Sequence, residues 1–253
     1  MTNIILSGCN GRMGQAITRI VEEKEGIKIV CGFDINTKPL NDYPVYAEYA
    51  GITEQADVII DFSNPANLEN LLTFAVNRNI PCVVATTGLT KDQLAILKET
   101  SKKIPVFFSA NMSLGVNLII ELACRAAKLL EGSFDIEIIE KHHNQKLDAP
   151  SGTALAIADA ISDSLSAPTQ YVYDRHCVRK KRDTNEIGIH SVRGGTIVGD
   201  HSVLFAGNNE MIEINHTATS REVFAVGAVK AAQFLADKPV GLYNMKDLVN
   251  EMA

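Results

Sequence analysis

A glycine-rich turn near the N-terminus constrains the fold of this chain more than any other stretch. The sequence LSGCNGRMGQAI places Gly8, Gly11 and Gly14 between an apolar run typical of a strand and a segment of helical period. This order brings backbone amides and the positive end of a helix dipole to one point, where a pyrophosphate binds. Asp34 ends the next expected strand, where an acid accepts hydrogen bonds from the adenosine ribose. The pattern predicts a dinucleotide site.

The first half of the chain alternates short apolar runs with segments of helical period. Strands are expected at 3–7, 27–33, 58–62, 81–85 and 105–108, and helices at 12–25, 65–78 and 91–102. A βαβ alternation of this kind favours a parallel sheet with helices on both faces. We therefore expect an α/β domain of the Rossmann type, with a doubly wound parallel sheet.

The pattern changes after residue 113. A helix is expected at 116–130, strands at 134–140, 186–192, 196–205 and 211–217, and a hairpin turn at 207–209. Helical period returns at 221–235. We expect two domains: a dinucleotide-binding domain at 1–113, on which segment 221–253 packs back, and an α+β domain at 114–220.

Composition and charge argue against several classes of protein. The formal net charge of −6 opposes general nucleic-acid binding, although RHCVRKKR at 175–182 is locally basic. No apolar run is long enough to span a membrane, and the first residues do not resemble a signal peptide. We expect a cytoplasmic protein that binds neither nucleic acid nor membrane.

The five cysteines form no C-x-x-C pair, which favours a reducing compartment over a disulfide framework. Cys9 stands in the glycine turn beside a helix N-terminus, where the pKa of a thiol can be lowered. A small residue that fills the turn is the preferred interpretation of Cys9.

Residues 140–161, EKHHNQKLDAPSGTALAIADAI, gather proton donors and anion-binding groups ahead of an amphipathic helix. Ser151 is expected to cap this helix, so that Gly152 and Thr153 present backbone amides at its positive end, beside Lys146. This arrangement predicts a pocket for a carboxylate. The two adjacent histidines point to opposite sides of an extended chain and no other ligand pattern accompanies them, so no metal site is expected.

In this stretch the sequence closely resembles the 4-hydroxy-tetrahydrodipicolinate reductase family, formerly called dihydrodipicolinate reductases. The family signature E-x-H-H-x-x-K-x-D-x-P-S-G-T-A is complete from Glu140 to Ala154. Four further blocks keep the family order: G-x-x-G-R-M-G at 8–14, T-T-G at 86–88, S-A-N-x-S-x-G-V-N at 109–117 and E-I-G-I-H-S-x-R-G-G at 186–195. Together these blocks span almost the whole chain.

The resemblance implies an NAD(P)H-dependent reductase of lysine and diaminopimelate biosynthesis, a homotetramer built through the sheet of its second, substrate-binding domain. It assigns proton donation to His142 and Lys146. The residues expected to bind the dicarboxylate substrate are His143, Lys146, Ser151, Gly152, Thr153 and Thr87. Those expected to bind the dinucleotide are Gly8, Cys9, Asn10, Gly11, Arg12, Met13, Asp34, Ala85, Thr86, Thr87, Ser109, Ala110, Asn111 and Met112.

Cofactor preference stays open between NADH and NADPH. Asp34 repels a 2′-phosphate and so favours NADH, whereas Arg12 and Lys38 partly neutralise such a phosphate. Two residues near the expected nicotinamide depart from the family pattern: Ala85 stands where Gly is frequent, and Met112 where an aromatic residue is frequent. These departures bear on details of cofactor contact.

Two alternative functions share part of this pattern. An amino-acid dehydrogenase of the same architecture would share the glycine turn but lack the block at 140–154. A non-catalytic dinucleotide sensor would keep the cofactor site and lose the acid, and the presence of both His142 and Lys146 weighs against it.

Overall fold

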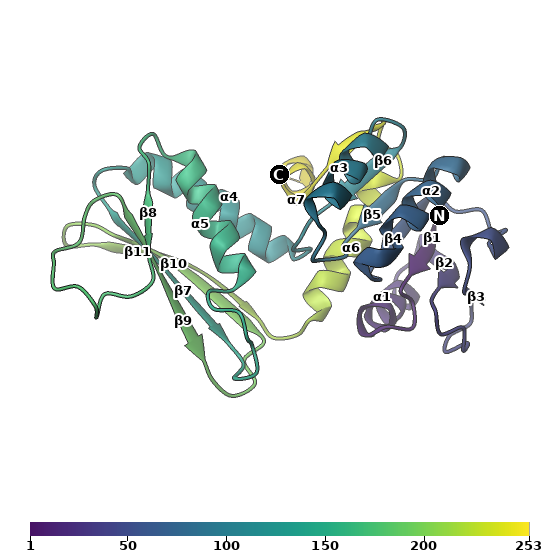
Figure 1. Ribbon diagram of the computed structural model, residues 1–253, viewed down its shortest axis with the longest axis horizontal. Coiled ribbons are helices and arrows are strands. Elements are labelled where there is room, and N and C mark those ends of the chain that lie inside the picture. The colour runs from purple at the N-terminus through teal and green to yellow at the C-terminus, as the bar shows by residue number, and fades with distance from the viewer. Residues whose placement is uncertain (253) are drawn as a thin grey trace. The chain divides into compact units, whose positions relative to one another are not determined.

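The computed structural model describes residues 1–252, in which the chain forms two compact units (Figure 1). The first unit combines Met1–Leu114 with the C-terminal segment that begins at Glu222, and the second is Gly115–Arg221. Within residues 1–252, no helix has the length and apolar character needed to span a membrane.

The first unit is built on a seven-stranded sheet in which every pairing is parallel. Its strands are β1 (Thr2–Ser7), β2 (Ile27–Phe33), β3 (Val45–Tyr46), β4 (Val58–Asp61), β5 (Cys82–Val84), β6 (Pro105–Phe108) and β12 (Gly241–Tyr243). The order β12-β6-β5-β4-β1-β2-β3 reverses direction between β1 and β4. Such a switch point is where ligands bind in open α/β sheets. The Rossmann-type prediction is confirmed.

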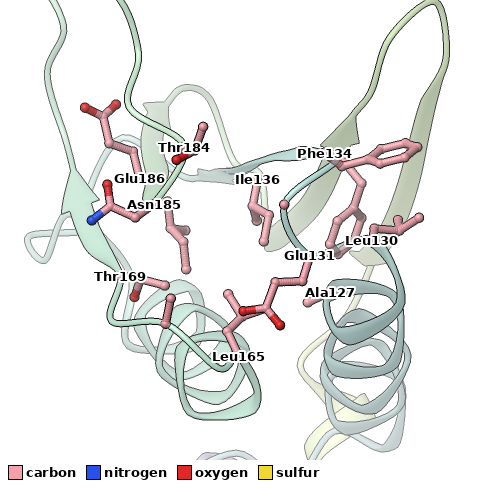
Figure 2. A pocket seen from close by; sticks show the side chains of 14 residues that line it. Ala127, Leu130, Glu131, Phe134, Ile136, Leu165, Thr169, Thr184, Asn185 and Glu186 are labelled. Carbon is pink, nitrogen blue, oxygen red and sulfur yellow. The ribbon is translucent and has the colours of Figure 1, made fainter.

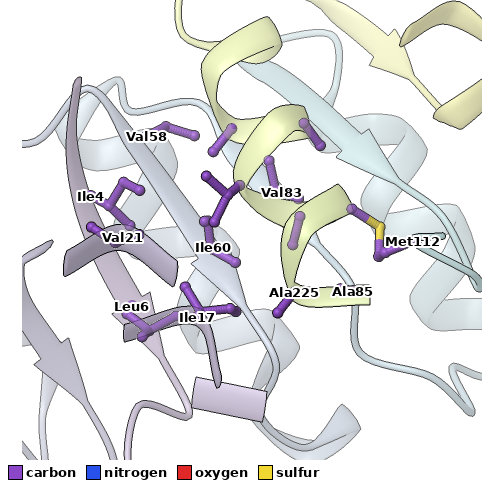
Figure 3. Close-up of a cluster of buried hydrophobic side chains, with 14 of the residues drawn as sticks. Ile4, Leu6, Ile17, Val21, Val58, Ile60, Val83, Ala85, Met112 and Ala225 are labelled. Atoms are coloured by element: carbon purple, nitrogen blue, oxygen red, sulfur yellow. The ribbon is translucent and has the colours of Figure 1, made fainter. Parts of the chain in front are cut away.

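Helices cover both faces of this sheet, which explains why its strands are almost continuously apolar. The helices of the unit are α1 (Arg12–Glu22), α2 (Leu68–Arg78), α3 (Lys91–Thr100), α6 (Glu222–Leu235) and α7 (Met245–Met252), with 3₁₀ turns at Tyr49–Gly51 and Pro65–Asn67. Ile4 and Leu6 of β1 join a buried cluster with α1 and α6, whereas Ile5 joins the cluster beneath α2 and α3. Figure 3 shows the first cluster, with α6 lying over β4 and β5.

The second unit is a five-stranded mixed sheet covered on one face by two helices. Its elements are α4 (Leu114–Leu130), β7 (Asp135–His142), α5 (Gly152–Ser164), β8 (Gln170–Val172), β9 (Glu186–Arg193), β10 (Gly199–Ala206) and β11 (Met211–Ala218). The strand order is β11-β10-β7-β9-β8. Apolar residues of α4 and α5 pack on Ile136 and Ile138 of β7. Because side chains alternate along a strand, Glu140 and His142 share this helix-covered face.

The hairpin between β10 and β11 is confirmed, with Asn209 at a φ of 66° and the Gly207 amide donating to the Glu210 carbonyl. The sequence did not indicate β3, β8 and β12. Each has only two or three residues, too few for a period to appear, and each pairs at an edge of its sheet.

Candidate active site

The glycine turn between β1 and α1 is closed by contacts that exclude side chains. Gly8 has a φ of 78°, and a Cβ there would lie 2.5 Å from the Phe62 carbonyl oxygen. A Cβ on Gly14 would lie 2.3 Å from the Gly8 carbonyl oxygen. Any larger residue at Gly8 or Gly14 would push the backbone apart. The glycines of the sequence pattern are therefore required by the close approach of backbone carbonyl groups.

Most amides of the turn already have acceptors inside the protein. Those of Gly8 and Cys9 donate to the Phe33 carbonyl, and that of Gly11 donates to the Gly8 carbonyl. Gly11 is the N-cap of α1 and offers no side chain to cap it. The first amides of the helix, at Arg12 and Met13, therefore have neither an intrahelical acceptor nor an N-cap side chain. These amides fit the pyrophosphate of a dinucleotide.

Asp34 is half-buried beside this turn. Its Oδ2 accepts the Asn10 amide at 3.0 Å and its Oδ1 accepts the Asn36 amide at 3.0 Å. The Asn10 side-chain amide donates to the carbonyls of Asn36 and Lys38, at 2.5 and 2.9 Å, which ties the two loops together. A carboxylate has about four acceptor positions. Asp34 thus holds the loop and keeps capacity for the hydroxyls of a ribose.

Cys9 fills the core beneath the turn. Its side chain is fully buried, and a Cβ on Gly32 would lie 2.4 Å from its Sγ. Burial, with a smaller contribution from the charge of Asp34, raises the pKa of Cys9 to about 12. The possibility of a lowered pKa is therefore wrong, because desolvation outweighs the helix N-terminus, and the interpretation of Cys9 as a filler holds.

The loop after β5 is held by a buried carboxyl group, Asp61, which was not among the predicted site residues. Asp61 ends β4, and its two oxygens accept the hydroxyls of Thr86 and Ser63, each at 2.6 Å. Burial raises the pKa of Asp61. Thr86 is buried by this contact, whereas Thr87 is exposed. The available signal was an acid directly after an apolar strand, at the edge where parallel strands end.

The loop after β6 is organised by its own side chains. The Ser109 hydroxyl donates to the Asn111 carbonyl at 2.8 Å, and Asn111 Oδ1 accepts the Ser113 amide at 2.9 Å. Ala110 is exposed. Met112 points its side chain into the core of the first unit, so only its backbone faces the loop surface.

In the second unit, a buried carboxylate orients His142. Glu140 Oε2 lies 2.6 Å from His142 Nδ1, and both oxygens of Glu140 accept the Arg193 guanidinium, at 2.7 and 2.8 Å. The Ser151 amide adds a bond of 3.1 Å. Burial alone would raise the pKa of Glu140, but the hydrogen bonds from Arg193 and His142 outweigh it and lower the pKa to about 2.

An ionised Glu140 can only accept a hydrogen bond, so Nδ1 of His142 carries the proton. The other ring nitrogen, Nε2, lies beside β10, where a Cβ on Gly199 would approach it to 3.2 Å. His142 is therefore held in one tautomer, with the proton on Nδ1 and the lone pair on Nε2.

His201 is a second histidine of this cluster. Its Nε2 lies 3.0 Å from the Ser151 hydroxyl, and its ring packs edge-on against His142 with centroids 5.2 Å apart. Burial, reinforced by the neighbouring His142, lowers the pKa of His201 to about 4. His201 is thus neutral near pH 7 and supports Ser151. This role could not be predicted from the sequence, because His201 lies on β10, about 50 residues from Ser151.

The loop between β7 and α5 carries the other predicted residues. Lys146 Nζ pairs with Asp148 Oδ1 at 2.9 Å, and the Lys146 amide donates to the carbonyl of the half-buried His143. Ser151 is confirmed as the helix cap, since its hydroxyl accepts the Ala154 amide at 3.1 Å. Open space lies where a Cβ on Gly152 would stand. Thr153 follows in the first turn of α5.

The predicted residues therefore fall into two sets. One set lies between the end of β7 and the start of α5 and consists of His142, His143, Lys146, Ser151, Gly152 and Thr153. Thr87 belongs to the first unit, with the residues expected to bind the dinucleotide.

The basic run at 175–182 is largely neutralised by acids of its own unit. Arg175 pairs with Glu137 and Glu186, and Arg182 pairs with Asp135 and Glu137. These ion pairs fasten the long loop before β9 to the sheet.

A cavity of about 140 Å³ lies near the start of β7 (Figure 2), whereas Glu140 and His142 lie at the end of that strand. Its lining is mostly apolar and includes Leu130, Phe134 and Leu165. The Glu131 carboxylate already accepts the amide and hydroxyl of Ser166. The cavity thus holds none of the predicted catalytic residues.

Two protein-family models match the chain and together cover most of it. The model described as dihydrodipicolinate reductase, N-terminus, matches residues 2–112. The model described as dihydrodipicolinate reductase, C-terminus, matches residues 115–249.

Individual relatives agree with these matches. A 4-hydroxy-tetrahydrodipicolinate reductase of Caldanaerobacter subterraneus subsp. tengcongensis is 55% identical over 251 residues, with 99% of each chain covered. Its counterpart in Clostridium tetani is 50% identical over 250 residues, which cover 99% of this chain and 98% of that protein.

Solved structures show the same likeness. A dipicolinate-bound dihydrodipicolinate reductase from Paenisporosarcina sp. TG-14 has a TM-score of 0.82 at 25% identity, covering 98% of this chain and 99% of that one. A DAP dehydrogenase of C. glutamicum has a TM-score of 0.60 at 12% identity over 98% of this chain and 95% of that one, which shows a shared fold alone. The resemblance inferred from the motifs is confirmed: the chain belongs to the 4-hydroxy-tetrahydrodipicolinate reductase family.

Proposed function

We propose that the chain reduces 4-hydroxy-tetrahydrodipicolinate to tetrahydrodipicolinate with NAD(P)H, in lysine and diaminopimelate biosynthesis. The observation that carries the proposed roles is the Glu140–His142 pair, an ionised buried carboxylate 2.6 Å from Nδ1 of the histidine. The relatives named above carry this activity in their names.

The substrate is a dicarboxylate, and the loop before α5 suits its charges. Lys146 and His143 offer charged or polar donors, and Gly152 and Thr153 stand at the positive end of the helix. Thr87 is the residue of the first unit proposed to join them. Charge-assisted hydrogen bonds to two carboxylates both attract the ring and fix its orientation.

The reduction needs a proton as well as a hydride, and the bound nicotinamide supplies the hydride. His142 is proposed to deliver the proton from Nε2 of its protonated ring, because Glu140 binds Nδ1–H and leaves Nε2 as the nitrogen available to a ligand. General acid catalysis of this kind contributes roughly 10²- to 10⁴-fold to a rate. Lys146 is proposed as the second donor and as a clamp for a substrate carboxylate.

The dinucleotide is proposed to lie along the turn at 8–13, with its ribose at Asp34 and its nicotinamide near 85–87 and 109–112. NADH is favoured, because the carboxylate of Asp34 repels a 2′-phosphate. Arg12 and Lys38 are exposed and keep NADPH in use as a second cofactor.

A homotetramer is proposed to assemble through the sheet of the second unit, in a cytoplasmic setting. Several apolar side chains on this sheet are exposed to solvent, among them Val192, Met211 and Ile212. Apolar groups of this kind favour association between subunits.

The activity is tested by generating the substrate in situ from pyruvate and aspartate semialdehyde with the preceding synthase. Absorbance of NADH or NADPH is then followed with and without the chain. Oxidation that depends on the chain is expected, and it is expected to be more efficient with NADH. No oxidation of either cofactor would refute the proposed function.

A further inference from the structure

The loop between β7 and α5 contains a carboxylate that engages the same groups proposed to receive the substrate. Asp148 Oδ1 lies 2.9 Å from Lys146 Nζ. Lys146, with a smaller contribution from the backbone amide of Gly152, lowers the pKa of Asp148. In the protein without substrate, an internal anion therefore satisfies part of the anion pocket.

The backbone of Asp148 is fixed while its side chain is accessible. Arg193, which also holds Glu140, donates from Nη2 to the Asp148 carbonyl at 2.6 Å. The Asp148 side chain is 57% exposed, whereas that of Lys146 is 22% exposed. Rotation about the side-chain bonds of Asp148 would release Lys146 without any movement of the loop.

We propose that Asp148 is an internal competitor for the anion pocket, which stands in for one substrate carboxylate and yields its place when the dicarboxylate binds. This inference rests on the proposed function. A ligand with one carboxylate only replaces the contact that Asp148 already makes, and so gains little. A ligand with two carboxylates replaces that contact and adds a second one, which supplies net affinity.

Removal of the internal anion should then strengthen binding, whereas loss of a merely structural residue would weaken it. The probe is dipicolinate, pyridine-2,6-dicarboxylate, titrated calorimetrically into the full chain with NADH present. For Asp148→Asn we expect the Kd of dipicolinate to fall about three- to tenfold and the substrate KM to fall with it. The Kd of the monocarboxylate pyridine-2-carboxylate should fall by about the same factor, because Asp148 competes equally with a carboxylate of either ligand.

A matched control exists in the same unit. Asp183 pairs with Lys180 at 2.7 Å and its side chain is 58% exposed, which is nearly the exposure of Asp148. Asp183→Asn removes a comparable surface charge away from the pocket, so its Kd for dipicolinate should equal that of the wild type. Asp148→Glu retains the charge and should not bind more tightly than the wild type.

Unchanged or weaker binding of dipicolinate by Asp148→Asn would overturn the inference. Binding by Asp148→Glu that is as tight as that by Asp148→Asn would also overturn it. Wild-type protein that neither binds dipicolinate nor oxidises NAD(P)H would instead refute the proposed function on which the inference rests. Tight wild-type binding with no gain in Asp148→Asn would leave the function standing and remove only the role of Asp148.

Discussion

Two buried carboxyl groups, Asp61 of β4 in the first unit and Glu140 of β7 in the second, lie at or near the carboxyl ends of their strands, and their pKa values are shifted in opposite directions. Asp61 accepts two hydroxyl groups, and burial raises its pKa. Glu140 accepts a bidentate Arg193, a histidine and a backbone amide, and its pKa is lowered to about 2. Burial is therefore not what sets the charge of a buried acid. The partners decide it, and only Glu140 has a cation.

The presence or absence of a neighbouring cation suits the two carboxyl groups to different structural roles. An uncompensated carboxyl such as Asp61 suits the positioning of neutral hydroxyls, here those of Thr86 and Ser63. A compensated carboxylate such as Glu140 imposes one tautomer on a neighbouring imidazole.

The strongest way to break the comparison is to remove the cation. Arg193→Met leaves Glu140 buried without its counter-ion, and we expect a loss of about 3–5 kcal/mol in the free energy of unfolding. Thermal and urea denaturation measure it. Arg19→Met is the control, because Arg19 and Glu222 form an exposed pair that contributes at most about 1 kcal/mol. Equal losses in the two variants would contradict the account.

The pH dependence of stability should have opposite signs for the two acids. The pKa of Glu140 is about 2 in the fold against an ordinary 4.5, so its stabilisation, about 3 kcal/mol at most, is present above pH 4.5 and lost as the pH falls towards 2. The raised pKa of Asp61 has the reverse effect, a contribution present in acid and lost as the pH rises through that pKa.

Urea denaturation at pH 5 and pH 3 tests these signs. The stability advantage of the wild type over Glu140→Gln should shrink on acidification. The free energy of unfolding of the wild type, measured relative to that of Asp61→Asn, should increase on acidification. A change of the same sign for both variants would show that the two carboxyl groups do not differ as described.

Glu140→Gln should impair catalysis through the tautomer of His142. Arg193 and the Ser151 amide both donate to Oε1 of Glu140, so the carbonyl of the glutamine will keep that place and turn its NH₂ group towards His142. Nδ1 must then accept, and the proton moves to Nε2. We expect kcat to fall about 100-fold, within the range for general acid catalysis.

A matched control lies on the same strand. Glu137 also binds a histidine and two arginines, His190, Arg175 and Arg182, but its side chain points to the opposite face of β7. Glu137→Gln should keep kcat within about twofold of the wild type, because no proposed site residue depends on it. Comparable losses of kcat in the two variants would remove the special role of Glu140.

The smallest expected effect is that of Asp61→Asn. The amide is nearly isosteric and can still accept one of the two hydroxyls, so we expect a cost of about 1 kcal/mol. If Asp61 positions Thr86 for the dinucleotide, the KM for NAD(P)H should rise a few-fold with kcat little changed. A fall in kcat with an unchanged cofactor KM would contradict this positioning role.

Features that depend on local sequence were predictable, and those that depend on strand register were not. The Ser151 cap and the β10–β11 hairpin follow from adjacent residues and are confirmed. Arg193 reaches Glu140, and His201 reaches Ser151 and His142, only because β9 and β10 flank β7 in a register that aligns Arg193 with His142 and His201 with Glu140. Cys9 could not be judged from the turn alone, because its pKa depends on the core beneath.

The central claim, that ionised Glu140 fixes the tautomer of His142, is tested most directly by ¹⁵N NMR of the histidine ring nitrogens. The His142 signals are assigned by their loss in His142→Gln, and the neutral ring is observed in the wild type and in Glu140→Gln. We expect a proton on Nδ1 in the wild type and on Nε2 in Glu140→Gln. A proton on Nε2 in the wild type, or the same tautomer in both proteins, would contradict it.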